Sequence, residues 1–388
     1  MREAEQFGSL PGYPWAMNLF VPFVRPEMPD AESMTAHFES IAQSNWHTNF
    51  GPKERLFCTG IEEFIGSNVH AATASNATIG IMAALSALLP RGDGSEYIAI
   101  ASFTFAAGAD AIVWHGYKPA WIDVDAPSAQ PSLRSFESLL ESGTPVRGLI
   151  LTNSFGIANP EVSRWEQIAA SRNIPIVIDS AAGFGSRYPG GELLGARGDC
   201  EVFSFHATKP FAIGEGGAVV ARDPEVIARV RAFTNFGFIE RERGASALGL
   251  NGKLSEIAAA VGLTQLERFE EALEERRAVI IRYKEELDHS AIAFLENIEL
   301  SSVGFAALLV DTTLRRDEIL ASLGDANVEA KAYYSPPVHV HPYFTRFRNS
   351  VDLSVTDSLA SRALSLPVLP RMSEEEIERV CDAVKRCL

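Results

Sequence analysis

The chain has 388 residues, of which 46% are hydrophobic and 22% are charged, and its formal net charge is −16 at pH 7. These values are typical of a globular protein with room for one large or two ordinary domains. The acidic balance and the lack of a basic cluster argue against a nucleic-acid partner.

Neither the cysteines nor the apolar segments indicate secretion or a membrane protein. The four cysteines have no paired metal-ligand spacing, which predicts reduced thiols in a cytoplasmic protein: Cys58, Cys200, Cys381 and Cys387. The N-terminal stretch 1–15 contains no apolar signal core. The most apolar region, 98–114, is interrupted by Ser102, Thr104 and Asp110, so it does not fit a membrane span.

Helices and strands are expected to alternate along most of the chain. The spacing of apolar residues predicts helices at 31–43, 79–89, 161–171 and 225–233. It predicts strands at 69–74, 97–101, 119–124, 148–153, 176–178, 203–205 and 218–220. Strands that alternate with helices at short spacing indicate an α/β fold with a doubly wound, mainly parallel sheet. A turn is expected at 48–52 and an irregular loop at 235–250.

The pattern changes after residue 250. A helix is expected to open at 250–256, followed by a long amphipathic helix marked by apolar residues at helical spacing: Leu266, Phe269, Leu273, Ile280 and Leu287. From about residue 290, strands and helices in the order strand, helix, strand, helix indicate a smaller α+β domain. We therefore divide the chain into a large α/β domain, 1–265, and a second part, 266–388, with the linking helix and the small domain.

Asp179 follows a run of β-branched residues without alternation, which is typical of a buried central strand of a parallel sheet. It would lie at the carboxyl end of that strand, where open α/β sheets place their ligand crevice. A buried carboxylate at that place needs a charged or donor partner. The alternative is that Asp179 is the N-cap of a following helix.

Lys209 ends the sequence Phe-Ser-Phe-His-Ala-Thr-Lys and precedes a glycine-rich turn at 214–217. No acidic residue lies within five positions on either side. Burial lowers the pKa of a lysine and frees its amine for Schiff-base chemistry. The alternative is an ordinary surface lysine, and the apolar and small neighbours argue against it.

A possible anion site lies where the strand 69–74 meets the helix 79–89. Asn76 is a good N-cap, with Ala77 and Thr78 after it. Free N–H groups and the helix dipole both point outward at such a helix start, so the turn can hold a phosphate. Simple capping without a ligand is the alternative.

Together these motifs resemble the pyridoxal-phosphate site of the DegT/StrS-type (DegT/DnrJ/StrS) sugar aminotransferases, which act mostly on nucleotide-linked keto-sugars. The resemblance rests on Asp179 with small residues after it, Gly198-Asp199, the motif that ends at Lys209, and Gly-Glu-Gly-Gly at 214–217. It implies fold type I: a seven-stranded type of mainly parallel sheet between helices, plus a smaller C-terminal α+β domain. Some relatives are dehydratases with histidine in place of the lysine, so Lys209 favours transamination.

The resemblance also implies roles for individual residues. Lys209 would bind pyridoxal 5′-phosphate covalently and then act as general base and acid, while Asp179 would keep the pyridine nitrogen protonated. The other implied cofactor contacts are Asn76, Ala77, Thr78, Phe105, Ala182, Ser204 and Asn251. Asn251 would reach the cofactor of a neighbouring subunit, which implies a homodimer with shared active sites. A helix cap is the alternative role for Asn251.

The implied substrates are an amino donor, L-glutamate in most of the family, and a keto-sugar, with pyridoxamine phosphate as the aminated form of the cofactor. Residues near the substrate would be Thr48, Lys253, Tyr334 and His339. A plain turn is the alternative for Thr48. His339 and His341 could suggest a metal pair, but no third ligand is apparent, so no metal is expected.

Three positions depart from the family pattern. Asn76-Ala77-Thr78 stands where the family has Ser-Gly-Thr, Lys253 replaces an arginine, and Ala182 replaces a glutamine or histidine. Because alanine offers no donor, the cofactor is better determined than the keto-substrate. A non-nucleotide ketone such as an aminocyclitol precursor therefore stays open, as do a sugar dehydratase and a non-catalytic regulatory protein.

Overall fold

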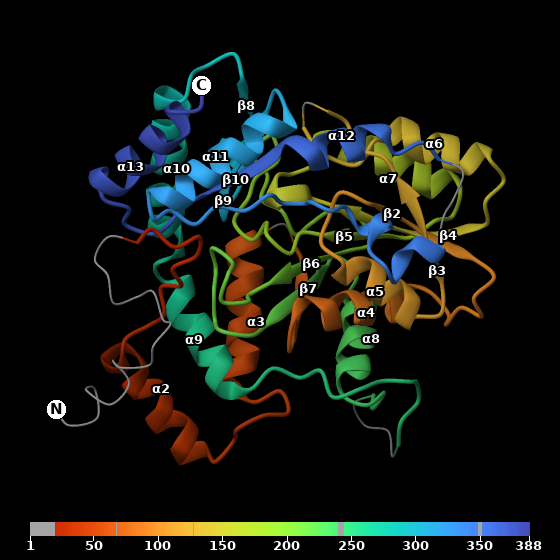
Figure 1. The fold of residues 1–388 in the computed structure, drawn as a ribbon. Coiled ribbons are helices and arrows are strands. Elements are labelled where there is room, and N and C mark those ends of the chain that lie inside the picture. The colour runs from red at the N-terminus through yellow and green to blue at the C-terminus, as the bar shows by residue number, and fades with distance from the viewer. Residues whose placement is uncertain (1–19, 67, 127, 240–243, 348–350) are drawn as a thin grey trace.

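A seven-stranded sheet forms the centre of the computed structural model, which describes residues 20–66, 68–126, 128–239, 244–347 and 351–388 (Figure 1). Its strands are β1 (His70–Ala74), β2 (Tyr97–Ala101), β3 (Lys118–Ile122), β4 (Val146–Thr152), β5 (Ile176–Asp179), β6 (Cys200–Ser204) and β7 (Gly217–Ala221). Their order is β1-β7-β6-β5-β4-β2-β3, and β7 alone runs antiparallel to its neighbours. The mainly parallel sheet is thereby confirmed.

Helices cover both faces of this sheet (Figure 1). One face carries α4 (Ala77–Leu88), α5 (Ala107–Trp114) and α8 (Pro224–Thr234), and the other carries α6 (Leu133–Glu141) and α7 (Val162–Ser171). Alternate strand residues point to opposite faces. Val177 and Val202 therefore pack in the cluster with Ile81, while Ile178 packs in the cluster with Trp165.

A second group of helices lies beside β1 and extends to the linking helix. It comprises α2 (Ala31–Ser44), α3 (Pro52–Ile65), α9 (Glu256–Leu266) and α10 (Phe269–Glu286). The start of α9 differs from the expectation, because Ser255 is its N-cap and accepts a hydrogen bond from the N–H of Ala258 at 3.2 Å. Asn251 lies four residues before the cap, so the interpretation of Asn251 as a helix cap is wrong.

The C-terminal part forms a small antiparallel sheet with helices. Its strands are β8 (Ile292–Phe294), β9 (Phe305–Val310) and β10 (Ala363–Pro367), in the order β10-β9-β8. Its helices are α11 (Thr313–Asp325), α12 (Ser354–Arg362) and α13 (Glu374–Lys385). It also contains the short 3-10 turns η3 (Ile298–Leu300), η4 (Val338–Val340) and η5 (Phe344–Arg346), whereas η2 (Ser154–Gly156) follows β4. The expected alternation of strand and helix is wrong in detail, since two strands come first and two helices precede the third strand.

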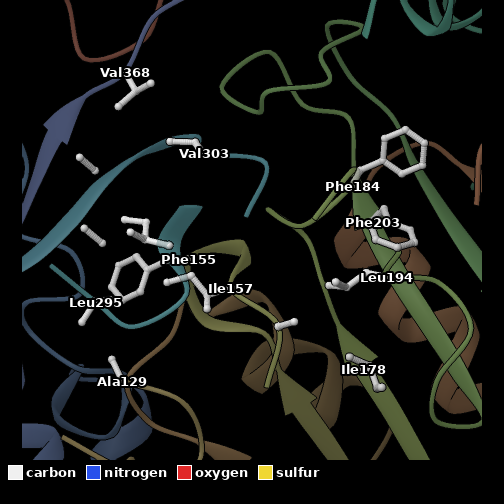
Figure 2. Close-up of a cluster of buried hydrophobic side chains, with 14 of the residues drawn as sticks. Ala129, Phe155, Ile157, Ile178, Phe184, Leu194, Phe203, Leu295, Val303 and Val368 are labelled. Atoms are coloured by element: carbon white, nitrogen blue, oxygen red, sulfur yellow. The ribbon is translucent and has the colours of Figure 1, made fainter. Parts of the chain in front are cut away.

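The largest hydrophobic cluster contains residues of both sheets. Figure 2 shows part of it, with Phe155 beside Leu295 and with Val303 and Val368 nearby. The division of the chain at residue 265 stays a prediction, because buried side chains from both parts belong to this one cluster. Among the described residues, no helix combines the length and apolarity that a membrane crossing requires. The segment 1–15, expected to lack a signal core, lies outside the described residues.

Candidate active site

Asp179 is the last residue of β5 and is buried at the carboxyl edge of the parallel strands. One of its carboxylate oxygens accepts the backbone N–H of Ala181 at 3.1 Å. The segment 180–199 that follows contains turns and bends but no helix. The alternative interpretation of Asp179 as a helix N-cap is therefore wrong.

Lys209 lies in the hairpin that joins β6 to the antiparallel β7. Backbone hydrogen bonds hold this hairpin closed: the N–H of Phe205 donates to the carbonyl of Gly216 at 2.9 Å, and the N–H of Ala207 donates to that of Gly214 at 2.8 Å. The residue as a whole is partly exposed, and its amine lies deep in the protein. The short connection keeps Lys209 at the same edge of the sheet as Asp179.

The Lys209 amine and the Asp179 carboxylate are close enough to shift each other's protonation. Burial lowers the pKa of Lys209, and the negative charge of Asp179 partly opposes this shift. Burial likewise raises the pKa of Asp179, whereas the Ala181 N–H and the charge of Lys209 lower it. A buried lysine with a lowered pKa is more readily neutral and nucleophilic than a surface lysine.

The expected phosphate turn lies at the start of α4, beside the end of β6. The side chain of Asn76 accepts the N–H of Ile79 at 2.9 Å, as the N-cap prediction requires. Gly217 on β7 pairs with both Ala74 on β1 and Ser204 on β6, so the helix start that follows β1 and Ser204 lie on either side of β7. A Cβ at Gly217 would lie 2.9 Å from the N of Ala77, so only glycine leaves this cradle open. The cradle fits a phosphate group.

Aromatic side chains gather at the same edge of the sheet. Phe105 follows β2 and its side chain is 68% exposed, which leaves an apolar ring available for stacking. The ring of Tyr334 stacks on Phe155 at 5.1 Å between centroids and meets Phe103 edge-on at 5.8 Å. Burial and then the charge of Asp179 raise the pKa of Tyr334. The structure thus brings Tyr334 from the C-terminal part close to Asp179.

His339 is tied to the end of β2 by a contact that the sequence did not predict. The hydroxyl of Ser102 accepts the backbone N–H of His339 at 3.0 Å and lies 2.7 Å from its Nδ1. The other ring nitrogen, Nε2, lies 3.4 Å from the Asp357 carboxylate. His339 is therefore fixed in orientation near the aromatic group.

Ala182, Thr48, Asn251 and Lys253 lie in less enclosed places. Ala182 presents only a methyl group, and its carbonyl accepts the hydroxyl of Ser302 at 2.7 Å. Thr48 lies in an exposed bend before α3. The Lys253 amine donates to the side-chain oxygen of the exposed Asn251 at 2.8 Å.

Asn251 nevertheless lies close to the phosphate turn of its own chain. The N–H of Ser75, next to the Asn76 cap, donates to the carbonyl of Gly252 at 2.7 Å. Asn251 itself forms a β-bridge with Asn235. The segment 251–252 therefore lies along the outer side of the cradle.

No group of three or more metal-binding side chains occurs among the residues that the structure describes. The Nε2 of His341 lies 3.1 Å from the carbonyl of Pro336. The four cysteines are free thiols, with three of them buried.

Comparison with known proteins agrees with this geometry. The model of the DegT/DnrJ/EryC1/StrS aminotransferase family matches residues 29–385. The chain belongs to this aminotransferase family. It is a transaminase that depends on pyridoxal phosphate, as the resemblance in the sequence implied.

Relatives of the aminotransferase include proteins with and without a named activity. Protein Rv3402c of Mycobacterium tuberculosis (strain ATCC 25618 / H37Rv) is 43% identical over 94% of this chain and 89% of its own. A dTDP-4-amino-4,6-dideoxy-D-glucose transaminase of Shigella dysenteriae is 29% identical over 93% of this chain and 97% of its own. The crystal structure of DesI with its TDP-sugar product has a TM-score of 0.86 at 30% identity, covering 96% of this chain and 94% of that one.

The sequence did not predict a role for Glu201 on β6, which is a buried carboxylate of the aminotransferase. It accepts hydrogen bonds from the hydroxyl of Ser180, from the side-chain amide of Asn153 at 3.4 Å, and from the N–H of Gly195 at 2.5 Å. Burial raises the pKa of Glu201 to about 7. Since the N–H of Asn153 also donates to the carbonyl of Asp179 at 2.9 Å, this network supports the segment that carries Asp179.

Proposed function

We propose that the protein transfers an amino group from an amino acid, L-glutamate, to a keto-sugar that is linked to a nucleotide. The observation that carries the proposal is the electrostatic coupling of Lys209 with the buried Asp179, beside a cradle for phosphate. The sugar substrate is supported by the transaminase of Shigella dysenteriae, by DesI with its TDP-sugar product, and by the GDP-perosamine synthase of Escherichia coli O157:H7.

Each site residue has a chemical role in this proposal. Pyridoxal phosphate supplies an aldehyde that captures amines and a ring that accepts electrons. Lys209 provides the amine that anchors the aldehyde, and its neutral Nζ takes and returns the proton of the amino donor. Asp179 keeps the pyridine nitrogen protonated, while the start of α4 and Ser204 hold the phosphate. Phe105 covers one face of the ring.

We also propose that the protein works as a homodimer. Large apolar side chains are exposed on α3, α9 and the loop after α8, close to Asn251: Leu56, Phe236, Phe238, Leu248 and Ile257. A patch of this kind is typical of an interface between subunits. A second subunit on this surface would enclose Asn251 and Lys253, which are the residues expected to be shared.

The first experiment follows the visible absorption of the purified protein with pyridoxal phosphate before and after addition of L-glutamate. We expect a band that bleaches with L-glutamate and returns with a TDP-linked keto-sugar. Lys209→Ala should abolish the band, whereas Lys118→Ala, at the start of β3, should leave it unchanged. A Lys209→Ala variant that transaminates at the parent rate would end the proposal.

The acceptor is tested separately from the donor. Bleaching that is reversed only by ketones without a nucleotide would replace the nucleotide-sugar with an acceptor such as an aminocyclitol precursor. We include ketones without a nucleotide because Ala182 and Lys253 depart from the family pattern. Loss of a hydroxyl from a keto-sugar, with no amine transferred, would indicate a dehydratase instead.

A further inference from the structure

A small cavity lies behind Lys209, where four parts of the chain meet. Its volume is about 30 Å³, and its lining comes from the segment 23–27, the Lys209 hairpin, α9 with α10, and the loops next to β9 and β10. Four cationic side chains and one carboxylate line it: Arg25, Lys209, Arg268, Arg276 and Glu27. Neither Asp179 nor Ser204 does, so this cavity differs from the phosphate cradle.

Arg276 on α10 is the most deeply buried of these cations, with 7% of its surface exposed. Its Nη1 donates to the carbonyls of Val303 at 3.2 Å and Val368 at 2.7 Å, residues that Figure 2 shows near each other. Its Nε has no acceptor among the described residues. No described carboxylate lies within 4.0 Å of its guanidinium, so the charge has only neutral partners.

Arg268 is partly exposed, and its charge acts on the carboxylate of Asp30, but its own hydrogen bonds also go to neutral groups. Its guanidinium donates to the side-chain oxygen of Gln265 at 2.8 Å and to the carbonyl of Glu27 at 2.7 Å, and both acceptors are neutral. The nearby carboxylates already form ion pairs with other arginines. Glu27 pairs through its side chain with Arg371 at 3.1 Å, and Glu376 pairs with Arg25.

We propose that this cavity binds a small monovalent inorganic anion of halide size between the guanidinium groups of Arg276 and Arg268. A buried cation is costly unless an opposite charge or a full set of hydrogen bonds compensates it. An anion here would accept from the free Nε of Arg276 and supply one negative charge between the two guanidinium groups. Burial also lowers the pKa of Arg276 to about 10, and the charges of Glu27 and Glu275 only partly oppose this shift.

The size of the cavity selects the anion. The volume of about 30 Å³ is small, and it exceeds what a single water-sized particle needs. A halide therefore fits, and this small volume favours it over a tetrahedral phosphate or sulfate with four oxygens. The bound ion would contact or lie beside three parts of the chain that line the cavity: the segment 23–27, the Lys209 hairpin and the C-terminal part.

The test compares bromide with gluconate at fixed ionic strength, using the full-length protein. We expect the melting temperature to rise saturably with bromide by about 2–4 °C, because a ligand that binds only the folded state stabilises it. Phosphate should have no such effect. Crystals grown in sodium bromide should show one anomalous peak beside the Nε of Arg276. Equal melting curves in bromide and gluconate, or bromide crystals without that peak, would overturn the proposal.

Two variants separate the site from general salt effects. Arg276→Gln should weaken bromide binding by roughly tenfold or more, the effect of losing a charge-assisted contact. Arg277→Gln is the matched control, since Arg277 is the next residue of α10, also has an unpaired Nε, and does not line the cavity. If Arg276→Gln does not fold, Arg268→Gln provides the same comparison. Equal bromide affinity in the parent and in Arg268→Gln would contradict the site.

Discussion

Asp123, just after β3, binds Thr356 in the first turns of α12, although the two residues are 233 positions apart. One oxygen of the carboxylate accepts the backbone N–H of Thr356 at 2.7 Å and its hydroxyl at 2.7 Å. The other accepts the N–H of Val355 at 3.1 Å. Asp123 thus caps a helix of the C-terminal part from the edge of the large sheet, where its negative charge also complements the helix dipole.

Asp123→Ala should lower the free energy of unfolding by roughly 2–3 kcal/mol, because it leaves buried donors without acceptors. Urea unfolding followed by circular dichroism measures this loss. The matched control is Asp125→Ala, whose side chain is exposed two residues later and which should stay close to the parent. Equal losses in both variants would show that the contact to α12 is not the cause.

Asp179→Ala should separate cofactor binding from turnover. The phosphate cradle and Lys209 remain, so pyridoxal phosphate should still bind, while kcat should fall by about 10²–10³-fold, as expected when a preorganised charge at the reacting group is removed. Absorption titration measures binding, and a coupled assay with L-glutamate measures kcat. Unchanged kcat would remove Asp179 from the proposed mechanism.

Ser102→Ala should act on one half of the reaction. Loss of the 2.7 Å contact to His339 Nδ1 frees the imidazole and costs about 1 kcal/mol, or roughly fivefold in kcat/KM for the keto-substrate. The half-reaction with L-glutamate should change little, since His339 is expected near the keto-substrate. Single-turnover measurements of each half-reaction make the comparison, with the exposed Ser95→Ala as control. Equal effects on both halves would contradict this division.

Glu201→Gln should change how stability depends on pH. Burial raises the pKa of Glu201 from 4.5 to about 7, so the folded state keeps a proton that the unfolded state releases. The resulting stabilisation is fully present below pH 4.5 and is lost as the pH rises through about 7. Glutamine carries no charge at any pH, so the variant lacks this titration.

The variant should therefore gain stability relative to the parent between about pH 5 and pH 8, by an amount on the order of 2–3 kcal/mol. Unfolding curves across this range measure the difference. Glu192→Gln, a partly exposed neighbour, should show little of the trend. Parallel pH profiles for Glu201→Gln and the parent would mean that Glu201 is ionised in the folded protein.

Local patterns in the sequence were enough to predict the central sheet and the main site. The run before Asp179 is apolar on every residue because β5 is buried on both faces, and the Asn76 cap is a local contact. The motif around Lys209 is continuous in the sequence because one hairpin contains it. Such features need no knowledge of distant neighbours.

The remaining features depend on contacts between residues far apart in the chain. Ser102 is one of many serines until the fold brings His339 to it, and Glu201 resembles a surface residue within its own segment. Arg276 fits the charged face of an amphipathic helix, yet it is buried against Val303 and Val368. A helix pattern cannot reveal that loops beside β9 and β10 cover this part of its polar side.

The β6–β7 hairpin closes locally, between Ser204 and Gly217, whereas the contact between Ser102 and His339 spans 237 positions. Local opening of the C-terminal part would therefore lift His339 and Tyr334 from the site without breaking the hairpin or the strand that ends at Asp179. The two sides of the site can thus differ in how often they open. In hydrogen exchange, the amides of 333–339 would lose protection well before those of β5 and β6.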